Sequence, residues 1–225
     1  MLLFSPRPGG GDDEASRRLL LSAAEKARAG SYAEAAELCR RSLDSSLDPL
    51  DEARARFLLG WLEFQGKRYQ PARSHFRFVA GAHPLLSYHA LYYGGRCFLA
   101  EGDDESARAL FDKLLGLSAP GDLAARTLME LLRHHRRRGE AEAASARLAA
   151  LDSLSWRDPF WARELDYTRG WVKLQQGEMA EARSRLHALW RDHPDSFWAG
   201  EAESLLLSRS SDLLLSLIHI SEPTR

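Results

Sequence analysis

Small and apolar residues recur along the chain at near-equal intervals. A turn residue is followed by an alanine that opens a helix, and an apolar residue stands four positions after that alanine. The five alanines are Ala35, Ala72, Ala107, Ala144 and Ala182, spaced 37, 35, 37 and 38 residues apart. The apolar residues are Cys39, Phe76, Phe111, Leu148 and Leu186. Positions four apart share one helix face, so this period predicts stacked helix hairpins.

Each hairpin also needs a first helix that the second can approach closely. Twelve residues before the alanines stand Ala23, Gly60, Gly95 and Gly170, whereas Leu132 breaks the pattern in the fourth unit. The turn glycines, such as Gly66, are expected to take the left-handed conformation that closes a helix. Pro84 and Pro194 are expected to end second helices, because proline cannot continue a helix. No segment alternates convincingly as a strand.

These residues resemble the tetratricopeptide repeat family, most closely in the second unit with Gly60, Tyr69, Ala72, Phe76 and Pro84. The resemblance covers about residues 14–208. It implies an all-α solenoid of about five antiparallel helix hairpins that forms a right-handed superhelix. We expect a disordered lead over 1–11 and one repeat domain over 12–208. Family members bind peptides, polymers or one another, so the resemblance implies a non-catalytic scaffold.

The last residues lack the repeat pattern. Ser208–Ser211 is expected to break the helical pattern, and residues 209–225 are interpreted as a non-native tail. Residues 215–225 resemble the translation of a transposase-type sequencing adapter. We therefore expect this chain to be a truncated fragment of a larger protein.

Composition and charge narrow the function classes. Hydrophobic residues make up 44% and charged residues 28%, and 31 basic residues face 32 acidic ones. A general attraction to nucleic acid is therefore not supported. No export signal and no transmembrane segment is visible, which leaves the compartment open. Cys39 and Cys97 are expected to pack as small apolar side chains.

Candidate chemistry is sparse, and we predict neither catalysis nor a cofactor. His134 and His135 are adjacent and expected to point about 100° apart on a helix, so no metal site is predicted. The basic run Arg133–Arg138 has two interpretations, a patch for polyanions or cations that complement a helix C-terminus. Asp12–Glu14 and Asp103–Glu105 are expected to cap helices.

The family resemblance places the first helix of each unit on the concave face. The residues expected on this face are Arg54, Phe57, Trp61, His89, Tyr92, Arg96, Glu164, Tyr167 and Trp171. Aromatic side chains flanked by charges suit an extended ligand. The alternative is that these rings pack against the neighbouring unit.

A second resemblance suggests a particular ligand. The stretch His83–Tyr93, followed by Gly102–Ala107, is similar to the superhelical N-terminal region of soluble lytic murein transglycosylases, and residues 193–202 resemble its linkers. That resemblance implies a periplasmic, cell-envelope arm that guides peptidoglycan strands, without the catalytic domain. Otherwise we expect a cytoplasmic scaffold with a protein or peptide partner, or an adaptor for acidic peptides.

Overall fold

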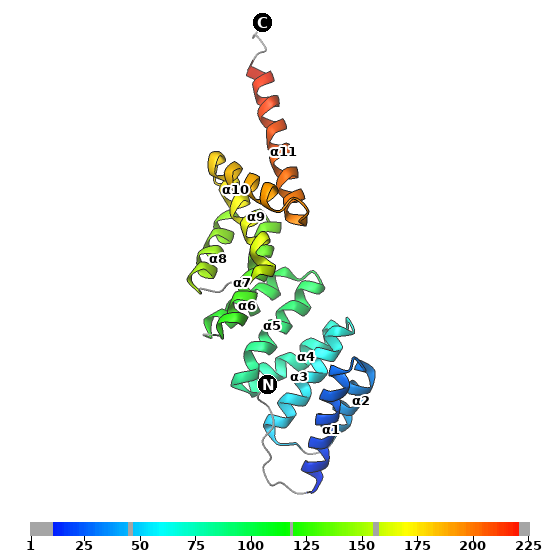
Figure 1. The fold of residues 1–225 in the computed structure, drawn as a ribbon. Coiled ribbons are helices and arrows are strands. Elements are labelled where there is room, and N and C mark those ends of the chain that lie inside the picture. The colour runs from blue at the N-terminus through cyan, green and yellow to red at the C-terminus, as the bar shows by residue number, and fades with distance from the viewer. Residues whose placement is uncertain (1–10, 45–46, 118, 155–157, 221–225) are drawn as a thin grey trace. The chain divides into compact units, whose positions relative to one another are not determined.

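The computed structural model describes residues 11–44, 47–117, 119–154 and 158–220, which form eleven α-helices and no strand (Figure 1). The helices are α1 (Gly11–Arg28), α2 (Tyr32–Leu43), α3 (Pro49–Gln65), α4 (Tyr69–Ala82), α5 (Pro84–Ala100), α6 (Asp104–Gly116), α7 (Gly121–Arg137), α8 (Ala141–Ser153), α9 (Pro159–Gln175), α10 (Met179–Asp192) and α11 (Phe197–Ile220). The all-α, tetratricopeptide-like solenoid that the spacing predicts is confirmed.

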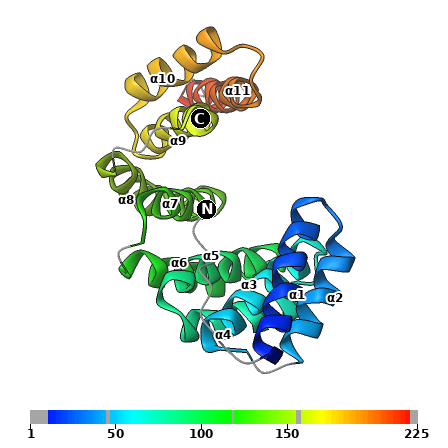
Figure 2. The same ribbon diagram turned by 60° about the horizontal axis from the view of Figure 1, so that its bottom comes forward.

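The contacts divide the chain into two compact units, one through Thr127 and one from Leu128. In the first unit α1 packs on α2, α3 on α4 and α5 on α6, and successive hairpins touch through α2–α3 and α4–α5 (Figure 2). In the second unit α9 contacts α8, α10 and α11. The single repeat domain over 12–208 that the repeat spacing predicts stays a prediction. The division falls inside α7, where Leu132 replaces the small residue of the other units.

All five hairpin turns use the same backbone hydrogen bonds. In the first, the Ser31 amide donates to the Lys26 carbonyl at 2.9 Å and the Gly30 amide donates to the Ala27 carbonyl at 3.2 Å. The equivalent bonds recur after α3, α5, α7 and α9. This is the Schellman motif, which requires a left-handed residue after the helix. Gly30, Gly102, Gly139 and Gly177 supply that residue with φ between +74° and +82°.

The turn after α3 corrects one prediction. Gly66 has φ −76°, and Lys67 takes the left-handed conformation instead, with φ +59°. The left-handed residue always stands five positions before the anchoring alanine, and position 67 is five before Ala72. Unit two has one more residue between its glycine and its aromatic than unit one, so its glycine is displaced from the position that needs it.

The small residues lie where the two helices of a hairpin nest. All five anchoring alanines are fully buried. A Cβ added to Gly95 would stand 2.5 Å from Phe111 Cε1, and one added to Gly170 would stand 2.7 Å from Leu186 Cδ2. At Gly60 the nearest Phe76 ring atom would be 3.1 Å away. In units two, three and five the first helix therefore approaches the second through a glycine that receives a large apolar side chain.

Prolines and aspartates set the helix boundaries. Pro84 lies at the first position of α5, with only His83 between it and the end of α4, and α10 ends before Pro194, as predicted. Asp103 caps α6 by accepting a hydrogen bond from the Ser106 amide at 3.1 Å. Asp48 caps α3 in the same way, accepting from the Leu50 and Asp51 amides. The acidic run Asp12–Glu14 lies in the first turn of α1.

The ends of the chain differ in part from expectation. Helix α11 continues through Ser208–Ser211 to Ile220, so the predicted break is wrong. No proline or glycine occurs there, and serine is tolerated in a helix. The suggested foreign origin of residues 215–225 stays a prediction, and residues 221–225 lie outside the described residues. Of the predicted disordered lead over 1–11, residues 1–10 also lie outside them, and Gly11 is the first residue of α1. Within the described part of the chain, no helix is long and apolar enough to span a bilayer.

Both cysteines are buried as expected. Cys39 and Cys97 have no exposed surface, and burial raises the pKa of each thiol to about 12. Each therefore packs as a small apolar side chain in the core.

Candidate binding face

The predicted binding residues occupy matching positions on three helices. Helices α3, α5 and α9 each contain 17 residues and begin with a proline. Counted from that proline, the nine residues are the sixth, ninth and thirteenth of their helix. Positions three and four apart lie on one face of a helix, so each trio forms a short stripe. Helices α3 and α5 also touch each other, which brings their two stripes together in the first unit.

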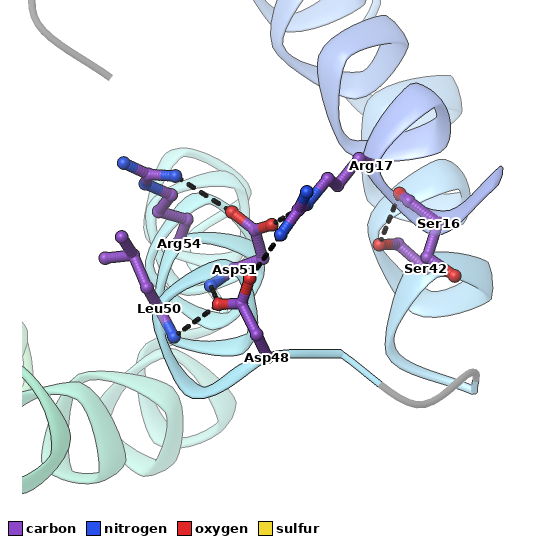
Figure 3. Close-up of polar contacts among 7 residues, drawn as sticks. All are labelled: Ser16, Arg17, Ser42, Asp48, Leu50, Asp51 and Arg54. Carbon is purple, nitrogen blue, oxygen red and sulfur yellow. Dashed lines mark hydrogen bonds and ion pairs between the residues drawn. The ribbon is translucent and has the colours of Figure 1, made fainter. Parts of the chain in front are cut away.

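Arg54 is held by a chain of ion pairs that links α1 to α3 (Figure 3). Its Nη1 donates to Asp51 Oδ1 at 2.8 Å, and Asp51 Oδ2 accepts from Arg17 Nε at 2.6 Å. Arg17 Nη2 also donates to Asp48 Oδ2 at 2.5 Å. Charge-assisted bonds of this kind fix the guanidinium in direction as well as in place. The Arg54 side chain is 17% exposed, and its Nε is buried.

Nearby, Ser42 on α2 donates to the Ser16 carbonyl on α1 at 3.0 Å, in the buried part of the same region (Figure 3). The Asp48 carboxylate accepts hydrogen bonds from the Asp51 and Leu50 amides and from the Arg17 guanidinium. These hydrogen bonds lower the pKa of Asp48 below its ordinary value. The carboxylate thus stays charged at neutral pH and orients Arg17 toward α3.

The aromatic side chains of the first unit join neighbouring helices. The Phe57 ring centroid lies 5.7 Å from that of Phe76 and 6.1 Å from that of Tyr93. Trp61 meets Tyr32 edge-on at 5.7 Å. Tyr92 is 8% exposed and contacts the Phe111 ring. Trp61 thus packs against the second helix of the neighbouring unit, as the alternative interpretation expects, whereas Phe57 and Tyr92 meet the second helix of their own hairpin. Phe57 and Trp61 keep part of their surface exposed.

Two polar residues of α5 complete this stripe. His89 is exposed and stands 6.3 Å from the Phe57 ring centroid. The Arg96 guanidinium carbon lies 5.1 Å from the centroid of Phe64 and 5.8 Å from that of Tyr92. Cation–π contacts of this kind hold an arginine against the helices, and its N–H donors lie in the plane of the guanidinium. The α3–α5 face therefore combines a partly covered aromatic floor with three half-buried or exposed polar heads.

The stripe on α9 is mostly covered. Glu164, Tyr167 and Trp171 are only 3%, 7% and 7% exposed. Glu164 accepts two hydrogen bonds from Arg133, from Nε at 2.8 Å and from Nη2 at 2.7 Å. Arg136 adds a longer contact to Glu164 at 3.4 Å. A bidentate pair of this kind fixes α7 against α9 within the second unit.

The same two arginines also cover aromatic rings of the second unit. The Arg133 guanidinium lies 4.4 Å from the Trp161 ring centroid, and that of Arg136 lies 4.7 Å from the Trp198 ring centroid. Burial lowers the pKa of Arg136, and the nearby Glu164 opposes that effect. Burial raises the pKa of Tyr167. The result is a layered arginine–aromatic cluster that joins α7, α9 and α11.

This cluster revises the interpretation of the basic run Arg133–Arg138. The run does occupy the last turn of α7, where cations complement the helix C-terminus. Arg133 and Arg136, however, turn toward α9 and pair with Glu164. Arg133 and Arg136 are three residues apart and therefore share one helix face. This spacing could have distinguished them, from the sequence, from the other cations of the run.

His134 and His135 also differ from expectation. Their ring centroids are 5.3 Å apart, so the two rings lean toward each other and do not diverge. One nitrogen of each ring and one carboxylate oxygen of Glu140 lie within 4.8 Å of one another. Adjacent positions on an ideal helix diverge by about 100° at the Cα atoms, but side-chain rotation in the last turn of α7 brings these ring atoms together.

Several exposed apolar residues were not predicted as candidate binding residues from the sequence. Phe160 and Phe197 lie in the first turns of α9 and α11, with 75% and 69% of their surface exposed, and each is edge-on to the following tryptophan. Surface hollows lie between α8 and α9, beside Leu151 and Ala162, and at the turn after α10. Neither hollow includes any of the nine predicted residues.

Comparison with known proteins identifies the family. Two profiles described as tetratricopeptide repeat match residues 20–84, 68–125 and 164–196. The matched residues make up more than half of the chain, which therefore belongs to the tetratricopeptide repeat family. Residues 126–163 are not covered, in keeping with the degenerate fourth unit. No curated protein matches the chain.

Two solved structures share the fold at low sequence identity. The first is YrrB, a "TPR protein with an unusual peptide-binding site", with TM-score 0.62 and 15% identity over 87% of this chain and 98% of that one. The second is PilF of Pseudomonas aeruginosa, with TM-score 0.55 and 16% identity over 87% of this chain and 99% of that one. At such identity the likeness shows the fold alone. Proteins of this fold are generally interaction scaffolds.

Proposed function

We propose that this protein is a non-catalytic scaffold that holds an extended segment of a partner protein along the α3–α5 face. The observation that carries the proposal is a set of partly accessible side chains on two touching helices. They are Arg54, Phe57 and Trp61 on α3 and His89 and Arg96 on α5. At two of the three matching positions the groups are similar, Arg54 with His89 and Phe57 with Tyr92, so part of the pattern repeats from one helix to the next. A peptide in an extended conformation has that kind of linear repeat.

The chemistry of the face suggests how the segment would be held. The guanidinium groups of Arg54 and Arg96 are held in fixed directions, and His89 can donate or accept at an exposed position. Peptide carbonyls and acidic side chains are suitable acceptors. The partly exposed rings of Phe57 and Trp61 would bury apolar side chains of the segment. The α9 stripe would contribute to the packing of the second unit, because its residues are largely buried.

The class of partner rests on the family and on the charge of this face. YrrB, a protein of similar fold, is described as having a peptide-binding site. The chain itself is close to neutral, with a formal net charge of −1. A local pair of arginines with no overall positive charge favours a protein segment over nucleic acid, which requires broad phosphate neutralisation.

Site-specific crosslinking tests this proposal. We would place benzoylphenylalanine at position 89 on α5 and, as a matched control, at position 108 on α6, since both residues are exposed. We expect one discrete adduct from position 89 and none from position 108. Arg96→Glu in the same chain should remove that adduct while leaving the circular dichroism spectrum unchanged. Equal crosslinking from both positions would contradict the proposed face.

The same variants separate a protein partner from a glycan. The resemblance to lytic transglycosylases suggests a peptidoglycan strand as the alternative ligand. Cosedimentation of the protein with purified murein sacculi, abolished by Arg96→Glu, would support that alternative. If the sacculi do not retain the protein and the adduct at position 89 contains a protein, the partner is proteinaceous.

A further inference from the structure

A cluster of metal-ligating side chains lies at the α7–α8 turn, away from the proposed binding face. His134 and His135 stand in the last turn of α7, and Glu140 is the residue that precedes α8. The Glu140 amide donates to the His135 carbonyl at 2.9 Å as part of the Schellman turn. The backbone therefore fixes Glu140 beside His135 before any side chain is considered. The three candidate ligand atoms all lie within 4.8 Å of one another.

The environment of His135 singles it out within this cluster. Its side chain is 3% exposed, and its Nδ1 lies 2.7 Å from Glu140 Oε2. An ion that takes the place of the proton between these two atoms is bound by both of them, and the neutral ring then carries its proton on Nε2. This Nε2 is buried and has no hydrogen-bond partner among the residues that the structure describes. Nδ1 and Oε2 are therefore the two atoms of this pair that would share an ion.

From this geometry we propose that His134, His135 and Glu140 bind a divalent transition-metal ion, with Zn²⁺ as the physiological occupant. Imidazole nitrogen suits Zn²⁺, Cu²⁺ and Ni²⁺, whereas Mg²⁺ and Ca²⁺ prefer sites made only of oxygen. Zn²⁺ has no geometric preference from its d electrons and accepts two imidazoles and a carboxylate. The proposal concerns a site independent of the peptide-binding function.

The distances require only side-chain adjustment. Two ligand atoms about 2.0–2.1 Å from a tetrahedral Zn²⁺ lie roughly 3.3 Å from each other. The His135–Glu140 pair, now 2.7 Å apart, would open slightly, and the widest separations in the cluster, up to 4.8 Å, would close. Rotation of two imidazole rings and one carboxylate covers this change. The Glu140 side chain is 40% exposed, so an ion can enter from solvent and water can fill the remaining position.

Arg138 modulates the site in two opposing ways. Its Nε donates to Glu140 Oε1 at 2.9 Å, which leaves Oε2 directed at His135. Partners of this kind orient a metal ligand. The positive charge of Arg138 also repels a cation, so its removal should strengthen binding. This second effect distinguishes a metal site from a structural hydrogen bond. If His135 and Glu140 formed only a hydrogen bond, loss of Arg138 would weaken that bond and would not increase the affinity for Zn²⁺.

Isothermal titration of the untagged, EDTA-dialysed full chain with ZnCl₂ tests the proposal. We expect one site per chain, weakened about tenfold or more by His135→Ala and by Glu140→Gln. His187→Ala, which removes an exposed histidine of α10, should leave the affinity unchanged. Arg138→Gln should tighten it. Zn²⁺ should also raise the unfolding temperature of the wild type, since the ion ties the end of α7 to the start of α8.

Two results would overturn the site. The first is Zn²⁺ affinity that His135→Ala and Glu140→Gln leave unchanged, since binding would then occur elsewhere. The second is an equal loss on His187→Ala, which would show nonspecific binding to surface histidines. Circular dichroism of each variant checks folding. Glu140→Gln keeps the size and shape of the side chain, so it decides between these outcomes even if His135→Ala fails to fold.

Discussion

Replacing Gly95 by alanine tests the nesting of paired helices most sharply. The added Cβ would stand 2.5, 2.8 and 2.9 Å from three atoms of the Phe111 ring, whereas carbon atoms pack at about 3.5–4.0 Å. Phe111 is 1% exposed, so its ring must move by about 1 Å within a packed core. Overpacking of this kind costs about 2–3 kcal/mol. Alanine recovers about 1 kcal/mol of helix propensity, which leaves a net loss of about 1–2 kcal/mol.

The adjacent Gly94 provides the matched control. A Cβ there would meet Leu110 Cδ1 at 3.2 Å, the far end of a flexible side chain, and Phe76 Cβ at 3.9 Å, an ordinary van der Waals contact. Gly94→Ala should therefore be neutral or stabilise by up to about 0.5 kcal/mol through helix propensity. Urea denaturation followed by circular dichroism at 222 nm would compare the two variants. The reasoning fails if Gly95→Ala is as stable as Gly94→Ala.

A double-mutant cycle identifies the responsible contact. Phe111→Leu alone should destabilise the chain, because it removes buried ring atoms. In the Gly95→Ala background the same change should cost less, since the smaller side chain relieves the overlap. A coupling of about 1 kcal/mol is expected for residues in direct contact. Strict additivity would mean that the ring does not fill the space above Gly95.

Three further predictions concern the turn after α3, its cap and the cysteines. Lys67→Gly should stabilise the chain by about 0.5–1 kcal/mol in urea denaturation, because only Lys67 among the turn residues has a side chain in the left-handed region. Asp48→Asn should reduce stability at neutral pH. The lowered pKa of Asp48 means that the wild-type advantage is present above the ordinary carboxyl pKa and lost as pH falls through the lowered value. Cys39 and Cys97 should react with a thiol reagent at pH 8 only after unfolding, since burial holds their pKa at about 12.

The sequence predicted the hairpins because their packing depends on residue size at fixed intervals. Positions 60, 95 and 170 require a small residue because the second helix packs against them, and the repeat period identifies the glycines there. The left-handed Lys67 was missed because the glycine beside it suggested the usual turn. Counting five residues back from Ala72 would have found it. The break predicted at Ser208–Ser211 was wrong because polar residues alone do not end a helix.

Less of the candidate binding face than of the helix hairpins could be predicted from the sequence. Positions on one helix show which residues share a face, but not which neighbouring helix covers that face. Glu164 and Trp171 matched Arg54 and Trp61 in position, yet the α9 residues are largely buried, and Glu164 is paired with an arginine of α7. The approach of His134 to His135 likewise depends on side-chain rotation that ideal helix geometry does not include.

Hydrogen–deuterium exchange of the full chain, with and without a partner recovered through the position-89 crosslink, tests the interaction face most directly. Binding along α3 and α5 should slow exchange in Pro49–Gln65 and Pro84–Ala100, with little change in the second helices of the same hairpins, Tyr69–Ala82 and Asp104–Gly116. Protection concentrated in α4 and α6, with none in α3 and α5, would contradict the proposed face.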